Sequence, residues 1–472
     1  MTMLNQEILN KVYNYIDRNK DNIIHDLITL ASIKSVSDKN TKIKPFGQGC
    51  LDALNHMLKL GETNHFVTQN FDNYVGKMTI PNNHKESIGI WAHLDVVPEG
   101  DDWMSEPYTP IIKDGCIFGR GVHDNKSGAI GGLYILKALS DLNIPTKHNI
   151  ELFFGTSEET GMDDVKYYVN HYPVPKFSFV PDASFPGMCG EFGRLRYELK
   201  SRKKLSDNFV ELSAGSVFNI IPNYAYAIIK DDYLDLNNIS DEYVVTKYDG
   251  LVKIETYGKS SHAAIPEYGI NAIHKLTSLI KNLKGLNEQD KAIIEFIDNV
   301  NLDSYGTYLG IDKIDDISGQ TVSSGTVLRL VDNYVAMLND CRHAVSNTNE
   351  ELMERIIKKC NEFNFDVKFV DISKPYYIDK QSDVVKLITN IYHERINDTS
   401  KTMVIGKGGS YAGKIPNSVA TGIILHDGYT KPAYLKEGHG GIHQPDECMN
   451  IEGYIEGIKL FARMVLEVDD LL

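Results

Sequence analysis

The chain of 472 residues is too long for one ordinary compact core, and a typical length of roughly 100–200 residues per domain favours two or three domains. Hydrophobic residues make up 42 % and charged residues 24 % of the chain, which is typical of a soluble globular protein and does not favour disorder. The net charge of −15 argues against nucleic acid and anionic membranes as partners, because phosphate binding requires a basic surface.

The cysteines and the N-terminal segment together predict a cytoplasmic protein. Few, widely spaced cysteines without a C-x-x-C pair are typical of a reduced, intracellular chain. The N-terminal segment MTMLNQEILNKVYNYIDRNKDN has no apolar core followed by a cleavage site, so we expect no signal peptide. No stretch reaches the roughly 18 apolar residues that span a bilayer. The cysteines are Cys50, Cys116, Cys189, Cys341, Cys360 and Cys448.

In chain order, the first third alternates apolar, strand-like runs with a helical pattern. The strand candidates are SIGIWAHLDVV (87–97), HNIELFFGT (148–156) and FSFVPDA (177–183). Between the first two lies NKSGAIGGLYILKALSDLN (125–143), in which leucines recur at helical spacing beside small glycines. Strands that alternate with helices predict an α/β layered domain.

From about residue 190 to 384 the pattern changes. The strand-like run GLVKIETYG (250–258) and the helical run INAIHKLTSLIKNL (270–283) are interrupted by polar, acidic stretches such as 230–243. We interpret this region as a second, α+β domain. The strand candidate KTMVIG (401–406) and a C-terminal helix with one apolar stripe follow. The order predicts one domain that is interrupted by an insertion and whose sheet is completed by the C-terminal segment.

Polar side chains lie where the predicted strands end and where the predicted helix begins. Active sites of open α/β sheets form at the carboxyl ends of the strands. These positions present one imidazole and five carboxylates: His93, Asp95, Asp124, Glu158, Glu159 and Asp182.

Each of these residues also has an ordinary structural explanation. An H-x-D segment after a strand is weak evidence by itself. Glu158 and Glu159 alone are typical of a solvated turn. Asp124 alone could cap a helix, and Asp182 alone could open a turn. Together, however, these residues indicate a metal site, because carboxylates that meet at one sheet edge repel one another unless cations bind them. Carboxylate and imidazole ligands together suit zinc, manganese or cobalt better than calcium.

Ordered segments along the whole chain resemble the two-metal exopeptidases of the aminoacylase and carnosinase type. Among these, the chain is most similar to bacterial dipeptidase V (PepV-like) enzymes. The segments are HLDVVP (93–98), W-x-x-x-P-Y-x-P (103–110), DGxIFGRGVHDNKSG (114–128), GTSEETG (155–161), PDASFP (181–186), YGKSSHAAIPEYGINA (257–272), GKGGSYAG (406–413) and GIHQPDE (441–447).

The resemblance implies five metal ligands for two divalent ions. His93 and Asp182 would bind one ion, Glu159 and His443 the other, and Asp124 would bridge both. Zinc is the first expectation, with manganese or cobalt as alternatives. Two such ions about 3.5–4 Å apart can share a hydroxide and polarise a peptide carbonyl.

The resemblance also assigns the acid–base chemistry. Glu158 would be the general base, and Asp95 would hold the His93 ring so that the correct nitrogen faces the metal. The choice of His443 over His439 rests mainly on the family match, because both lie in GHGGIHQ and their spacing does not separate them.

By resemblance, further residues would contact substrate. His262 would stabilise the developing oxyanion, Arg342 would bind the substrate carboxylate, and Asn219 would hold the substrate. Without the family, these residues would be explained as a loop histidine, a solvated arginine and a turn asparagine. Gly409 and Ser410 of the glycine-rich turn would offer backbone N–H groups to the same carboxylate.

The chain departs from the family pattern at two places. Asn125 stands where many relatives have a second aspartate, next to the expected ligand Asp124. Gly413 stands where relatives often have arginine, which puts the recognition of the substrate end in doubt.

The resulting prediction is an α/β hydrolase with a catalytic α/β/α domain around a central mixed sheet and an inserted α+β lid. The catalytic domain would comprise 1–188 and 385–472, and the lid 189–384. Lid closure would bring His262 and Arg342 to the metals. The expected activity is that of a metal-dependent dipeptidase, which acts on very short peptides with neither nucleic acid nor membrane as partner.

A monomer is expected, because in PepV-like proteins a longer lid replaces the dimer partner. The nearest alternatives are an N-acyl amino acid deacylase or desuccinylase. A non-catalytic metal-binding protein of the same fold is a further alternative. Function belongs to the site, and fold analogy alone does not decide among them.

Overall fold

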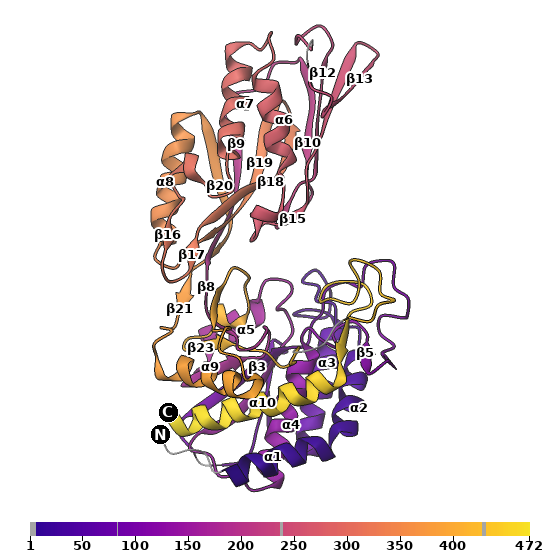
Figure 1. Ribbon diagram of the computed structural model, residues 1–472, viewed down its shortest axis with the longest axis vertical. Helices are drawn as coiled ribbons and strands as arrows, with labels where there is room; N and C mark the ends of the chain where they lie inside the picture. The colour runs from indigo at the N-terminus through magenta and orange to yellow at the C-terminus, as the bar shows by residue number, and fades with distance from the viewer. Residues whose placement is uncertain (1–5, 83, 237–238, 427–430) are drawn as a thin grey trace. The chain divides into compact units, whose positions relative to one another are not determined.

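A computed structural model describes residues 6–82, 84–236, 239–426 and 431–472. The chain forms two compact units (Figure 1). The first comprises Met1–Gly190, Ile378–Val404 and Gly409–Leu472, and the second comprises Glu191–Tyr377 and Ile405–Gly408. Among the described residues, no helix is long and apolar enough to cross a membrane.

The first unit is built on a mixed sheet in which β1, β2, β6, β3, β7, β23 and β8 are neighbours in that order. The strands β6, β3, β7 and β23 run parallel, whereas β1, β2 and β6 pair antiparallel. Their bounds are Val67–Phe71 (β1), Val75–Thr79 (β2), Ser87–His93 (β3), Asn149–Gly155 (β6), Phe177–Val180 (β7), Met188–Glu191 (β8) and Ser418–Ala420 (β23).

Helices pack against this sheet in a layered α/β arrangement. Helix α4 packs on β3 and β6, and α3 packs on β1 and β2. The contact of α4 is close, since a Cβ atom on Gly132 would lie 2.7 Å from the Leu152 side chain. The helices are α1 (Gln6–Arg18), α2 (Lys20–Ala31), α3 (Gln48–Thr63), α4 (Lys126–Asp141), α5 (Asp163–His171), α9 (Asp383–Ile396) and α10 (Ile451–Leu471).

The apolar stripe predicted for the C-terminal helix is buried, as Tyr454, Ile458, Phe461 and Val465 of α10 are all inaccessible to solvent. The strand candidates of the first third are confirmed with shorter bounds. The candidate 87–97, for example, gives β3, which ends at His93.

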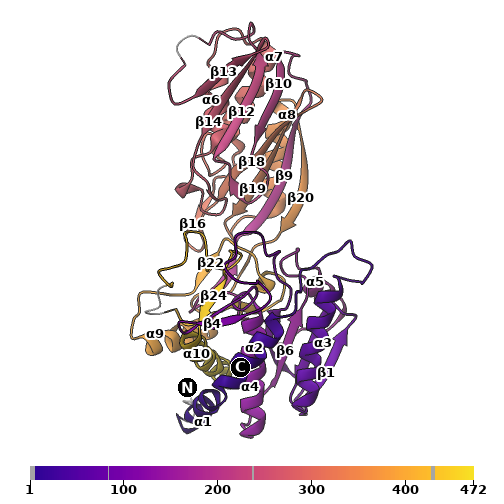
Figure 2. The same cartoon turned by 90° about the vertical axis from the view of Figure 1, so that its right-hand side faces the viewer.

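A small separate sheet joins distant parts of the first unit (Figure 2). Its order is β24-β5-β4, with bounds Cys448–Asn450, Cys116–Phe118 and Ile111–Lys113. The C-terminal segment is therefore fixed beside the segment that leads to Asp124.

The second unit contains an eight-stranded antiparallel sheet of order β13-β14-β12-β10-β18-β19-β9-β20. Alternate residues of β12 and β14 are buried, as expected when helices cover one face of a sheet. The strands are β9 (Gly193–Ser201), β10 (Phe209–Ala214), β12 (Tyr224–Lys230), β13 (Val244–Tyr248), β14 (Leu251–Tyr257), β18 (Val322–Val331), β19 (Tyr334–His343) and β20 (Phe365–Ser373).

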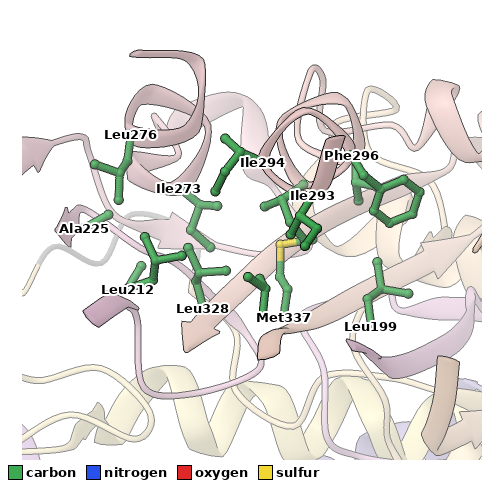
Figure 3. Close-up of a cluster of buried hydrophobic side chains, with 14 of the residues drawn as sticks. Leu199, Leu212, Ala225, Ile273, Leu276, Ile293, Ile294, Phe296, Leu328 and Met337 are labelled. Atoms are coloured by element: carbon green, nitrogen blue, oxygen red, sulfur yellow. The ribbon is translucent and has the colours of Figure 1, made fainter. Parts of the chain in front are cut away.

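Three helices, α6 (Ala272–Lys281), α7 (Glu288–Val300) and α8 (Asn349–Glu362), complete this unit. Figure 3 shows the core, in which Ile273 and Leu276 of α6 face strand side chains such as Leu212 and Leu328. The remaining short elements are β11 (Ile220–Ile221), β15 (Ser261–His262), β16 (Ile314–Asp315), β17 (Gly319–Gln320), β21 (Tyr376–Tyr377), β22 (Val404–Gly406), η1 (Pro266–Tyr268), η2 (Thr307–Leu309) and η3 (Tyr411–Gly413).

The predicted fold class is confirmed, because a mixed α/β sheet carries an inserted domain with its own antiparallel sheet. The six cysteines are all buried, and none of them forms a disulfide. Within the acidic stretch 230–243, residues 237–238 lie outside the described residues.

Candidate metal centre

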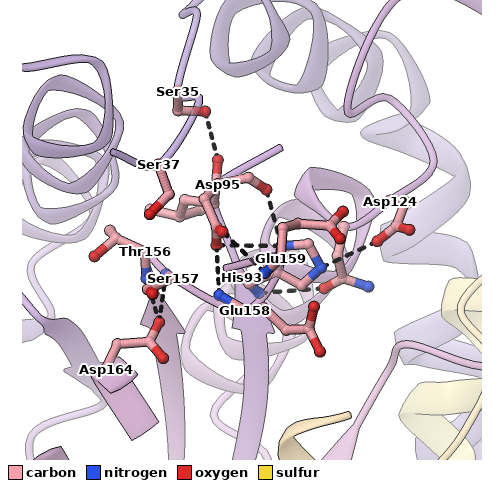
Figure 4. A network of polar contacts seen from close by, with 12 residues as sticks. Ser35, Ser37, His93, Asp95, Asp124, Thr156, Ser157, Glu158, Glu159 and Asp164 are labelled. Carbon is pink, nitrogen blue, oxygen red and sulfur yellow. Dashed lines mark hydrogen bonds and ion pairs between the residues drawn. The ribbon is translucent and has the colours of Figure 1, made fainter. Parts of the chain in front are cut away.

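The candidate ligands gather at the carboxyl ends of strands in the first unit, and Figure 4 shows three of them, His93, Asp124 and Glu159. His93 is the last residue of β3, and Asp182 follows two residues after β7. Glu158 and Glu159 lie in the turn that follows β6. These three strands run parallel, so their carboxyl ends meet and bring the side chains together.

Asp124 lies between two imidazoles and presents a different oxygen to each. Its Oδ1 lies 3.0 Å from Nε2 of His93, and its Oδ2 lies 3.1 Å from Nε2 of His443. The same His443 nitrogen is 2.9 Å from Oε1 of Glu159, and the His93 nitrogen is 3.9 Å from Oδ2 of Asp182. The five predicted ligands thus converge in two groups that share Asp124.

The electrostatics of this cluster favour positive charge between its members. Hydrogen bonds to Asp124 and Glu159 raise the pKa of His443 to about 10. Burial opposes protonation of His93, yet its hydrogen bonds to Asp124 and Asp95 raise its pKa well above the ordinary value. Burial, reinforced by the carboxylate of Asp124, likewise raises the pKa of Asp182.

The donor set fits divalent cations. Ligand atoms of His93, Asp124 and Glu159 lie within 4.8 Å of one another, a spacing compatible with metal binding. Carboxylate oxygens combined with imidazole nitrogens suit zinc, manganese or cobalt. His443 and Asp182 extend the group on either side of Asp124.

Asp95 is fully buried and organises both the first histidine and the glutamate turn. Its Oδ1 accepts the N–H of Glu158 at 3.0 Å, and its Oδ2 accepts the N–H of Glu159 at 3.1 Å. Nδ1 of His93 lies 2.9 Å from the carbonyl oxygen of Asp95. Because a carbonyl only accepts, Nδ1 carries the hydrogen and Nε2 faces Asp124 as a ligand atom.

Glu158, on the same turn, is a carboxylate that belongs to neither of the two predicted ligand groups. Burial raises its pKa well above the ordinary value; the nearby imidazole of His93 opposes this, and the carboxylates of Asp182, Glu159 and Asp95 add to it. A carboxylate in such surroundings has a stronger affinity for a proton than one in water, which suits a group that takes up and returns protons.

The structure separates His443 from His439. His439 is buried, with Nδ1 2.6 Å from Oδ2 of Asp446 and Nε2 3.3 Å from Asp102. Its two nitrogens therefore have partners outside the ligand cluster. His443 adopts a positive φ of 60°, and its side chain reaches Asp124 and Glu159.

Asn125 is a site residue whose contribution the sequence did not reveal. Its Nδ2 donates to the carbonyl of Pro181 at 2.6 Å and to Oδ1 of Asp182 at 3.1 Å, and its Oδ1 accepts the N–H of His93 at 3.4 Å. The buried amide therefore holds the ends of β3 and β7 together. It is also the N-cap residue of α4, and Asp124 directly before it faces the two histidines.

Replacing Asn125 by alanine is expected to weaken metal binding about 10- to 100-fold. Alanine can neither donate to Pro181 and Asp182 nor accept the N–H of His93. Titration of the metal-free protein with Co²⁺, followed by visible absorption, measures the effect. The Asn70→Ala variant makes the same change at an exposed position in β1 and should bind as the wild type does. Equal Co²⁺ affinity in Asn125→Ala and wild type would contradict this role.

The predicted lid residues are neighbours within the second unit. His262 of β15 pairs with Ile220 of β11, and the carbonyl of Asn219 accepts the N–H of Ala263 at 2.8 Å. Nδ1 of His262 accepts the N–H of Ala264 at 3.1 Å, so Nε2 carries the hydrogen and can donate. Burial lowers the pKa of His262, and the nearby charge of Arg342 lowers it further.

Arg342 is buried rather than solvated. Nε and Nη2 contact the carboxylate of Asp340 at 2.5 and 3.0 Å, and Nη1 donates to the carbonyl of Lys407 at 2.8 Å. The guanidinium is therefore held in one orientation by its own unit.

The glycine-rich turn is connected to the end of β6. The Ser410 hydroxyl accepts the N–H of Ala412 at the start of η3. The next residue, Tyr411, donates its hydroxyl to Asp164, which also accepts the N–H groups of Thr156 and Ser157. Gly409 is exposed in the same turn. Asp164 resembles an ordinary first-turn helix residue in the sequence, so its role here could not be foreseen.

Comparison with known proteins identifies the family. The model of peptidase family M20/M25/M40 matches residues 89–467, which is most of the chain. The chain belongs to this family. The M20 family implies a dinuclear metal site, for which the cluster around Asp124 is the candidate. The protein is therefore a metallopeptidase of the M20 type.

Named M20 relatives include a Staphylococcus epidermidis protein (strain ATCC 12228 / FDA PCI 1200) described as "Putative dipeptidase", which is 29 % identical over 430 residues, 86 % of this chain and 91 % of the relative. Human carnosine dipeptidase 1 has the same fold, with a TM-score of 0.59 and 14 % identity over 98 % of this chain and 99 % of that one. The dipeptidase Dug1p of Saccharomyces cerevisiae has a TM-score of 0.57 and 13 % identity over 98 % of each chain.

Proposed function

We propose that this M20 peptidase is a metal-dependent dipeptidase of the PepV-like type, which hydrolyses dipeptides or very short peptides. The observation that carries the proposal is the position of Asp124 between His93 and His443, with Glu159 and Asp182 completing two ligand groups. The dipeptidase names of the relatives support the substrate class.

A pair of divalent cations, with zinc as the first candidate and manganese or cobalt as alternatives, would activate water and polarise the peptide carbonyl. His93 and Asp182 would hold one cation, Glu159 and His443 the other, and Asp124 both.

Glu158 would take a proton from the attacking water and return it to the leaving amine. The backbone N–H of Glu158 is bound to Asp95, which keeps the turn fixed while the carboxylate stays free for that exchange. Glu158 and Glu159 divide the work of the turn between proton transfer and metal binding.

Substrate recognition by Asn219, His262, Arg342, Gly409 and Ser410 is part of the same proposal and rests on the family resemblance. In support, His262 presents a donor at Nε2 and the Arg342 guanidinium is held in one orientation. The cytoplasmic location, the monomeric state and the domain boundaries 188/189 and 384/385 stay predictions from the sequence.

Removal of metal by a chelator is expected to abolish hydrolysis of free-amine dipeptides, and addition of zinc, manganese or cobalt should restore it. The measurement is release of free amino acid from a panel of dipeptides, beside matching N-acetyl amino acids. Dipeptides should be cleaved faster than acyl amino acids. Preference for the acylated compounds would favour a deacylase. Binding of metal without cleavage of either class would favour a non-catalytic metal-binding protein.

A further inference from the structure

Glu447 is a buried carboxylate that the proposed mechanism does not use. Only 1 % of its side chain is exposed. It lies four residues after His443 and directly before β24. Burial of a carboxylate is unfavourable unless the charge is paired and its oxygens accept hydrogen bonds. Its partners therefore indicate why it is there.

One oxygen of Glu447 binds the loop that carries Asp124. Its Oε1 accepts the backbone N–H groups of Gly121 at 3.2 Å, His123 at 3.0 Å and Asp124 at 3.1 Å. Hydrogen bonds from backbone N–H groups to an ionised carboxylate are stronger than those between neutral groups. Three such bonds to one oxygen fix the loop immediately before and at the shared ligand.

The other oxygen of Glu447 is paired with a buried cation. Its Oε2 lies 2.7 Å from Nη1 of Arg120, of which 1 % is exposed. Nη2 of Arg120 donates to the carbonyl of Glu99 at 3.2 Å, and the guanidinium lies 5.1 Å from the ring centroid of Trp103. Arg120 pairs with the Glu447 carboxylate and orients it, because the guanidinium is itself held in place.

Backbone pairing joins the same two segments. β24 pairs with β5, and the N–H of Gly119 donates to the carbonyl of Glu447 at 2.9 Å. His443 and Asp124 are far apart in the sequence, yet their side chains meet at 3.1 Å. The contacts of Glu447 connect the segment that carries the first of these ligands to the loop that carries the second.

We propose that Glu447 is a positioning residue of the metal centre, which holds the Asp124 loop at the correct place relative to His443. The inference rests on the proposed two-metal site and adds a residue to its construction. Partners that hold metal ligands in place commonly change metal affinity about 10- to 100-fold when they are replaced.

Two variants separate this role from simple neutralisation of Arg120. Glu447→Gln removes the charge and turns an N–H₂ group toward either Arg120 or the loop. Glu447→Asp keeps the charge opposite Arg120 but withdraws the carboxylate by one methylene from the loop. If Glu447→Gln does not fold, Glu447→Asp still tests the proposal.

The first measurement uses metal-free protein. Hydrogen–deuterium exchange should be faster in both variants at the amides of Gly121, His123 and Asp124, whose N–H groups lose their acceptor. The second measurement is Co²⁺ titration with a competing chelator. The affinity is expected to fall about 10- to 100-fold, with an altered visible spectrum, and kcat should fall more than KM changes.

Asp469→Asn is the matched control. Asp469 is also buried, accepts the N–H groups of Lys147 and His148 at 2.8 and 2.9 Å, and pairs with the His148 ring. The Asp469→Asn variant should lose thermal stability and keep the Co²⁺ affinity and the visible spectrum of the wild type. The positioning role would be overturned if the Glu447 variants kept the hydrogen–deuterium exchange and Co²⁺ affinity of the wild type and lost only stability, as the control does.

The same experiments distinguish this proposal from the proposed activity. If the wild type binds Co²⁺ but cleaves no dipeptide, the dipeptidase assignment fails, and the affinity comparison still decides the role of Glu447. If the wild type binds no Co²⁺ at all, the positioning proposal fails with the metal site.

Discussion

Glu158→Gln is expected to lower kcat about 10²- to 10⁴-fold while metal affinity stays close to that of the wild type. Glutamine keeps the size of the side chain and its backbone bond to Asp95, but it cannot take up the proton of the attacking water. Steady-state hydrolysis of a dipeptide, combined with Co²⁺ titration of the same preparation, measures both quantities.

The neighbouring Glu159→Gln variant is the matched control for this prediction. Both residues lie on one turn, and both N–H groups bind Asp95. Glu159 contacts His443 at 2.9 Å, so its replacement should weaken metal binding as well as activity. If Glu158→Gln kept wild-type kcat, or lost its metal to the same degree as Glu159→Gln, the division of roles on this turn would be wrong.

The part of the centre that depends on strand ends could be predicted from the sequence. Parallel strands place the residues at their carboxyl ends along one edge, so His93, Glu159 and Asp182 were expected to meet. The apolar runs that mark buried strands are local signals, and they give the order of elements reliably enough to locate the edge. The register and order of the second unit's sheet depend on long-range pairing and could not be read in this way.

The residues that hold these ligands could not be predicted, because their partners lie far away in the sequence. Asn125 and Glu447 look like a helix start and a surface glutamate, and only the fold brings them to Pro181 and Arg120. The family resemblance indicated Arg342 but not its burial, which arises from Asp340 on the same strand. Sequence spacing identifies ligands at strand ends, whereas the contacts that orient them appear with the tertiary structure.

The different partners of His443 and His439 show how the tertiary structure distinguishes residues that the sequence leaves equivalent. Both histidines lie within GHGGIHQ, and both are able to bind a metal. Asp446, three residues after His443, accepts a hydrogen bond from Met104 with one oxygen and contacts His439 with the other. This contact draws His439 into the protein and leaves His443, half of whose side chain is exposed, to reach Asp124.

His443→Asn is therefore expected to lose both metal affinity and activity. The loss of affinity should exceed the roughly 10- to 100-fold that follows replacement of a residue that only holds a metal ligand in place. The metal-free variant should be less stable than the wild type near neutral pH, because it loses the protonated imidazole that pairs with Asp124 and Glu159. Ligand binding stabilises a protein in proportion to the logarithm of ligand concentration over Kd. The rise in Tm that Co²⁺ or Zn²⁺ produces in the wild type should consequently disappear in His443→Asn.

His439→Asn should differ from His443→Asn in its response to metal. The new amide can donate to Asp446, but the buried site loses a ring, and we expect the metal-free protein to be destabilised by about 1–3 kcal/mol. Its metal-induced rise in Tm should equal that of the wild type, since His439 has its partners outside the ligand cluster. Thermal unfolding of both variants with and without metal measures all four quantities. A rise in Tm that is kept in His443→Asn and lost in His439→Asn would show that His439, and not His443, binds the metal. It would also contradict the geometry on which the two-metal proposal depends.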